Sequence, residues 1–171
     1  GARIIVIRGT QTYEEWLGNL DFEETLGQEI GIDIDGFFHK NFGIVASQLW
    51  AKYQNYIIQS KLPVIITGHS RGAGLAEIFH VIAKKEIKKS VFLPPPIYCF
   101  AHAPPPSMSL NDSDSDELTR DIYGFVNGKD IVPRLFINSV LNIYSQVQLF
   151  SNGFYYACSF FLPESDCSSF K

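Results

Sequence analysis

The stretch Pro63-Val-Ile-Ile-Thr-Gly-His-Ser-Arg-Gly-Ala-Gly-Leu-Ala76 decides the fold, because it joins three signals in a fixed order. A short apolar run predicts a buried strand, the pattern Gly-x-Ser-x-Gly follows it, and an amphipathic helix comes next. A serine on so tight a strand-to-helix turn has strained backbone geometry, and its hydroxyl projects from the edge of the sheet. We therefore predict that Ser70 is a nucleophile; the alternative is a serine that only caps the helix.

The residues around Ser70 suit this chemistry. Gly68 and Gly72 allow the strand and the helix to approach each other without a clash of Cβ atoms. The helix points its N-terminus at the reacting centre, where its partial positive charge and its unpaired N–H groups favour an oxyanion. The N–H of Arg71 is therefore predicted to be one of the oxyanion donors.

Strand patterns and helix patterns alternate along the chain. Short apolar runs predict strands at 3–8, 63–67, 97–101 and 122–126. Apolar residues at intervals of three and four predict helices at 10–22, 37–58 and 72–87. This alternation predicts an α/β fold with a mainly parallel central sheet and helices on both faces. The acidic run Asn111–Glu117 is predicted to be a solvated loop, since it lacks the Gly and the terminal Glu of a calcium loop.

Length and composition limit the possible classes of protein. The 171 residues suffice for one domain, and 46% hydrophobic with 19% charged residues is ordinary for a soluble globular protein. A net charge of −4 argues against nucleic acid as a partner. No apolar run is long enough for a transmembrane segment, and no signal peptide is visible. The chain opens at Gly1 without an initiator Met, so we expect residues 1–171 to be one domain that is incomplete at both ends.

A nucleophilic serine needs a histidine as its base and a carboxylate that orients the histidine, in the chain order serine, acid, histidine. Asp130 fits the acid because it follows a predicted strand and a turn; Asp121 is the nearest rival, and a turn-capping role for Asp130 stays open. No histidine follows Asp130. The four histidines, each predicted to be structural, are His39, His69, His80 and His102. The triad is therefore incomplete within this sequence.

The chain has three cysteines, and this odd number argues against a full disulfide framework. Cys99 lies in an apolar run and is predicted to be a buried free thiol. Cys158 and Cys167 flank a short polar stretch, and their spacing leaves open whether they form a disulfide.

Over nearly the whole chain, these motifs resemble those of the fungal-type class 3 triacylglycerol lipases, which have the α/β-hydrolase fold. Ile5-Val-Ile-Arg-Gly-Thr10 is similar to the strand that ends in an oxyanion-hole residue, which implies that role for Thr10. Residues 12–22 are similar to the lid helix of the family. The lid residues that this likeness implies are Tyr13, Trp16, Leu17 and Leu20. Val126-Asn-Gly-Lys-Asp-Ile-Val-Pro-Arg-Leu135 resembles the segment of the catalytic acid, whereas Arg71 departs from the leucine of the family.

The end of the chain also resembles the family. The segment from Cys158 to Cys167 is similar to a disulfide segment, which implies this disulfide and an oxidising, extracellular compartment. In the family the catalytic histidine lies shortly beyond it, and this sequence ends at Lys171, so the resemblance implies that the base is missing from these residues and not replaced.

The resemblance implies a carboxylic ester hydrolase that acts on acylglycerols at a lipid–water interface, without a metal or another cofactor. A feruloyl esterase or a phospholipase A1 on the same fold is the alternative among enzymes. A lipase-like binding protein without activity is the alternative outside enzymes, and the missing histidine and Arg71 favour it.

Overall fold

The computed structural model describes residues 1–10, 23–89, 93–111, 113, 115–128, 130 and 132–134. The chain divides into two compact units, Gly1–Pro133 and Arg134–Lys171, and the elements described here belong to the first, apart from the last residue of a short 3-10 helix. None of the helices in the described ranges is long and apolar enough to cross a membrane.

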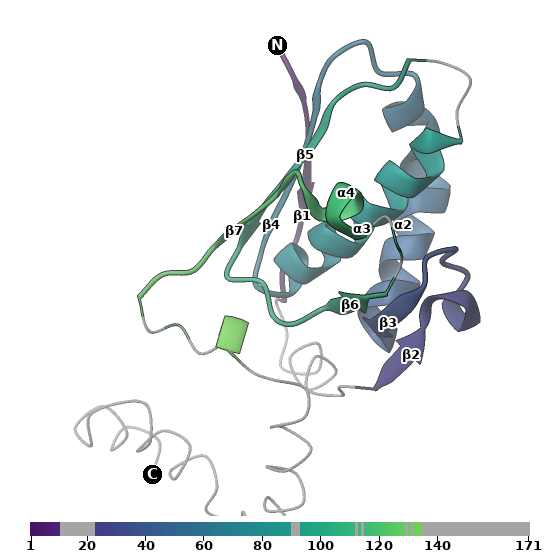
Figure 1. Cartoon of the computed structure of the whole chain (residues 1–171). Helices are drawn as coiled ribbons and strands as arrows, with labels where there is room; N and C mark the ends of the chain where they lie inside the picture. Colours follow the sequence, from purple (N-terminus) through teal and green to yellow (C-terminus); the bar gives the residue numbers. More distant parts are fainter. Residues whose placement is uncertain are drawn as a thin grey trace, which may run out of the picture. The chain divides into compact units, whose positions relative to one another are not determined.

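A four-stranded sheet forms the centre of the first unit (Figure 1). Its strands, in their order across the sheet, are β1 (Arg3–Ile7), β4 (Val64–His69), β5 (Ile97–His102) and β7 (Ile122–Phe125). All three neighbouring pairs are parallel, and Ile66 lies between Ile5 on one side and Cys99 on the other. Such apolar runs suit strands that are covered by other elements. The predicted α/β fold with a mainly parallel sheet is therefore confirmed.

Helices cover one face of this sheet. Helix α3 (Arg71–Lys88) lies on β4 and β5, while α2 (Lys40–Ile58) and the short α4 (Ser115–Thr119) pack against α3. The largest side chains that are fully buried include Phe38, Phe42, Phe79, Ile57, Ile66 and Ile78. Full burial of a side chain of this size contributes about 1.5–3 kcal/mol relative to exposure. These side chains come from α2, α3, β3 and β4, so the core lies among these elements. Cys99 is a buried free thiol, as predicted.

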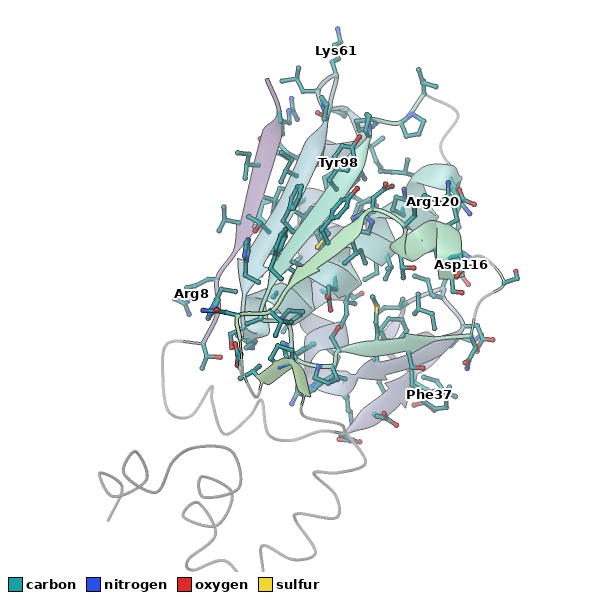
Figure 2. The ribbon with its side chains drawn as sticks, turned by 60° about the vertical axis from the view of Figure 1, so that its left-hand side comes forward. Arg8, Phe37, Lys61, Tyr98, Asp116 and Arg120 are labelled. Carbon is teal, nitrogen blue, oxygen red and sulfur yellow. The ribbon has the colours of Figure 1, made fainter. Side chains whose placement is uncertain are left out.

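The opposite face of the sheet carries no helix in the described part of the chain, and Figure 2 shows it turned toward the viewer with Tyr98 on it. Ile4 and Val6 of β1 are 62% and 73% exposed on this side. The ring of Phe100 stacks on the rings of Tyr123 and Phe125, with centroid distances of 5.3 and 6.2 Å. The predicted helices on this second face have no counterpart among the described elements.

A second, smaller sheet is antiparallel and was not predicted. It consists of β2 (Glu24–Leu26), β3 (Gly36–His39) and β6 (Met108–Leu110), with β3 in the middle, and the 3-10 helix η1 (Gly27–Ile30) follows β2. The prediction of a helix from Phe37 was therefore wrong at its start, because Phe37, Phe38 and His39 pair with neighbouring strands. Helix α2 begins only at Lys40.

Two short helices also depart from the prediction. The acidic run at 111–117 was predicted to be a loop, but α4 begins within it at Ser115 and buries Leu118 against α3. The 3-10 helix η2 (Val132–Arg134) follows Asp130. Both elements are too short for a periodic pattern to show in the sequence.

Candidate active site

The four parallel strands bring the predicted site residues to one edge of the main sheet. Ser70 follows β4 directly, Thr10 follows β1 next to it, and Asp130 follows β7. Since β1, β4, β5 and β7 are all parallel, their carboxyl ends lie at the same edge, which is where α/β folds build their sites (Figure 1). The topology thus brings these three residues to one edge of the sheet.

Ser70 occupies a strained turn between β4 and α3. Its backbone dihedral angles are φ 55° and ψ −126°, which a residue with a side chain rarely adopts. Such a conformation costs about 1–3 kcal/mol and persists only where the surroundings impose it. Here the N–H of Ser70 donates to the carbonyl of His102 at 2.9 Å, and its own carbonyl accepts the N–H of Ala73 at 2.8 Å.

Two glycines allow this turn because the backbone passes so close to them. A Cβ atom on Gly68 would overlap the carbonyl oxygen of Gly72 at the start of α3. A Cβ atom on Gly72 would overlap the carbonyl oxygen of Ile7 in β1. The spacing of the Gly-x-Ser-x-Gly pattern therefore reflects three segments of backbone in direct contact: β1, β4 and the first turn of α3.

The predicted oxyanion donors lie on either side of this turn. Arg71 is the first residue of α3, an 18-residue helix whose first N–H groups lack acceptors within the helix. Gly9 lies so close to the end of β4 that a Cβ atom there would be 2.8 Å from the carbonyl oxygen of His69. Thr10 comes next in the chain, so it lies near the turn that carries Ser70.

Asp130 is half-buried and belongs to a tight turn. Its N–H donates to the carbonyl of Asn127 at 3.0 Å, and its Oδ1 accepts the N–H of Val132 at 3.0 Å. The second bond is the turn-capping contact that the sequence left open as an alternative role. It uses one of about four acceptor positions of a carboxylate, so a hydrogen bond with a histidine is compatible with it.

The histidines fall into two groups. His39 and His80 are buried, His39 with its ring stacked on Phe42 at 3.9 Å, and burial together with the nearby Lys84 charge lowers the pKa of His80 to about 4. His69 and His102 are exposed neighbours at the ends of β4 and β5. The ring of His102 stacks on Phe125 at 5.0 Å, on the face of the sheet opposite α3.

Glu77 is a residue near the site that the sequence reasoning missed. It lies on α3 two turns beyond Ser70, and its Oε2 accepts a hydrogen bond from the hydroxyl of Ser107 at 3.0 Å. Burial raises the pKa of Glu77 to about 7, and the bond from Ser107 opposes that rise. The signal was present, because a single acidic residue interrupts the apolar stretch between Ala73 and Ala83.

Some predicted residues lie outside the described part of the chain. These are the lid residues Tyr13, Trp16, Leu17 and Leu20 and the cysteines Cys158 and Cys167. Within the described residues, no three His, Cys, Asp or Glu side chains lie together as possible metal ligands.

Residues 4–140 match the sequence profile of the family described as Lipase (class 3). Solved structures with the same fold include the lipase from Rhizopus microsporus var. chinensis, which is 19% identical with a TM-score of 0.58 and covers 80% of this chain and 48% of its own. A fungal lipase matches with 20% identity and a TM-score of 0.54, over 78% of this chain and 48% of its own. Lip2 lipase from Yarrowia lipolytica matches with 19% identity and a TM-score of 0.51, over 77% and 51%.

The chain thus spans about half the length of the solved structures that it matches. Among curated proteins, no sequence matches the chain significantly.

Proposed function

Because the chain belongs to the class 3 lipase family, we propose that it carries the nucleophile and the acid of a serine ester hydrolase. The observation that carries this proposal is the geometry of Ser70, whose backbone is strained at φ 55° at the N-terminus of α3. A serine held in this way, on the edge to which the topology also brings Thr10 and Asp130, fits the nucleophile of the α/β-hydrolase fold.

The proposed reaction proceeds through an acyl-enzyme. Ser70 Oγ attacks the ester carbonyl while a histidine, oriented by Asp130, takes the hydroxyl proton. The backbone N–H of Arg71 and the Thr10 residue stabilise the negative charge on the carbonyl oxygen. The histidine then protonates the departing alcohol, and a water molecule hydrolyses the acyl-enzyme and restores Ser70.

We propose acylglycerols as the substrate, with the segment that contains Trp16 as a lid that opens at a lipid surface. The rate should then rise steeply once the substrate exceeds its solubility, because the lipid surface opens the lid. Smooth saturation across that concentration would contradict the lid. A preference for feruloyl esters or for phospholipids would replace the acylglycerol assignment and leave the chemistry of Ser70 unchanged.

The organisation of the chain and its compartment belong to the same proposal. Residues 1–171 would be part of one α/β-hydrolase domain that is secreted and has a disulfide between Cys158 and Cys167. Peptide mapping of the native protein without reduction tests the disulfide directly, since a joined peptide supports it and two alkylated cysteines contradict it.

A fluorophosphonate probe tests the function of Ser70 in the full-length protein. An activated serine displaces fluoride from phosphorus and keeps the phosphonyl group, which mass spectrometry locates. Rapid labelling of Ser70, but of no residue in the Ser70→Ala variant, supports the hydrolase. A folded protein that is not labelled would contradict it and favour the lipase-like binding protein.

A further inference from the structure

The segment from Ala103 to Ser107 runs along one face of α3, beginning at Ser70 and ending at Glu77. At its start, the carbonyl of the preceding residue, His102, accepts the N–H of Ser70. In its middle, Pro105 lies against Gly74, where a Cβ atom would be 3.3 Å from the proline ring. Positions 70, 74 and 77 follow the spacing of one helix face, so the segment and the helix are in contact along two turns.

The length and the stiffness of the segment match this path. Two turns of helix from position 70 to position 77 rise about 10 Å. Three consecutive prolines, Pro104-Pro105-Pro106, favour an extended chain of about 3.1 Å per residue, so that four steps cover about 12 Å. Because each proline ring fixes its φ angle, a displacement at one end of the segment is transmitted to the other.

The segment is strained at its first residue, on the side of Ser70. Ala103 has a φ of 52°, which is left-handed for a residue with a side chain, and it is only 6% exposed. Its N–H donates to the carbonyl of Phe125 in β7 at 2.7 Å. Ala103 follows His102, whose carbonyl accepts the N–H of Ser70. Because a strained residue persists only where its surroundings hold it, Ala103 needs the rest of the segment to be fixed.

The last residue of the segment, Ser107, fixes its other end and is only 3% exposed. Its carbonyl accepts the N–H of His39 at 2.9 Å, and its hydroxyl donates to Glu77 Oε2 at 3.0 Å. Burial raises the pKa of Glu77, and the hydrogen bond from Ser107 lowers it. The pKa of the Cys99 thiol in β5 is raised mainly by burial and further by the Glu77 charge. Ser107 thus joins the small sheet and the proline segment to α3 through one partly buried carboxyl group.

We propose that Glu77 is a positioning residue: through Ser107 it fixes the proline segment, and through that segment it holds the His102 carbonyl against the N–H of Ser70. The carboxyl group does not touch the substrate. It acts on the backbone of the turn that presents the Ser70 hydroxyl, and in that respect the inference rests on the function proposed for Ser70.

The test combines hydrogen exchange with probe labelling in the full-length protein. In Glu77→Ala, amides of peptides that cover 100–108 should exchange at least about tenfold faster than in the wild type, because the anchor of the segment is lost. Labelling of Ser70 by the fluorophosphonate should slow by a similar factor, and kcat should fall with little change in KM. Glu77→Gln keeps an acceptor for the Ser107 hydroxyl and should restore both readouts to within about twofold.

Two controls make the outcome decisive. Glu86→Ala removes a glutamate from the far end of α3, where it bonds Lys89, and should leave exchange in 100–108 and labelling unchanged. Ser107→Ala should show the same defect as Glu77→Ala, and the double variant should be no worse than either, since both changes break one link. Additive defects, or wild-type exchange in a folded Glu77→Ala, would overturn the proposal. If Ser70 is not labelled in the wild type, the proposed function fails, while hydrogen exchange still tests the anchor.

Discussion

The two ends of α3 are built in different ways. At the N-terminal end, Ser70 is strained, Gly72 touches the backbone of β1, and Glu77 has its charge partly buried with a neutral partner. At the C-terminal end, partly or fully exposed lysines form ion pairs with carboxylates on neighbouring segments or on α3 itself. These pairs are Lys84–Asp121, Lys88–Glu117, Lys89–Glu86 and Lys89–Asp33. The N-terminal end therefore depends on close backbone contacts, whereas the C-terminal end depends on ion pairs that water and salt weaken.

This difference predicts that substitutions at the N-terminal end affect activity or stability strongly and that those at the C-terminal end do not. Because both groups of substitutions lie at α3, the stability of the helix itself affects both groups alike.

The largest effect is expected for Ser70→Ala. Loss of the nucleophile should lower ester hydrolysis by about 10³-fold or more, because the acyl-enzyme no longer forms. Alanine keeps the Cβ atom, so the thermal midpoint should change little. The rate of p-nitrophenyl ester hydrolysis measures this, and Ser109→Ala, at an exposed position of β6, is the control. A Ser70→Ala variant that retains the wild-type rate would remove Ser70 from the mechanism.

Gly72→Ala should be the most destabilising change on this helix. The new Cβ atom overlaps the carbonyl oxygen of Ile7, and backbone cannot move aside as a flexible side chain would. Forcing an extra methyl group into packed structure costs about 1–3 kcal/mol, and the upper end applies here. Denaturant unfolding measures it. Gly124→Ala in β7 is the matched control, because its Cβ atom would meet no described atom within 4 Å and its midpoint should stay near the wild type.

Glu77→Gln should stabilise the protein at high pH and not at low pH. Burial raises the Glu77 pKa from 4.5 to about 7, so the folded state binds the proton more tightly than the unfolded state. The stability from the protonated form is complete below pH 4.5 and is lost as the pH rises through 7. The glutamine variant does not titrate, and its advantage should grow to at most about 3 kcal/mol at pH 8. Unfolding curves from pH 4 to 8 measure the difference, and a constant difference would show that Glu77 titrates normally.

The sequence predicts the parts of the molecule that depend on local contacts, and it misses those that depend on contacts between distant residues. The strand, the Gly-x-Ser-x-Gly turn and the helix that follows it were predictable, because local sterics and apolar periodicity act there within a few residues. The small sheet was not, because Gly36–His39 pairs with Met108–Leu110, far away in the chain, and the apolar spacing that continues into α2 hides the strand. Glu77 was missed for a related reason: its partner Ser107 lies 30 residues away and only the fold brings them together.

The smallest effect is expected for Lys88→Ala. The Lys88 ammonium lies 2.7 Å from a Glu117 carboxylate oxygen, but the two side chains are 33% and 53% exposed. Water weakens the attraction between exposed charges, and ordering two long side chains opposes it, so the loss should stay below about 0.5 kcal/mol. A salt titration sharpens this test, because 1 M salt shortens the screening length to about 3 Å and should abolish what difference there is. A loss of stability as large as that of Gly72→Ala, unchanged by salt, would mean that the two ends of α3 are held by the same kind of contact.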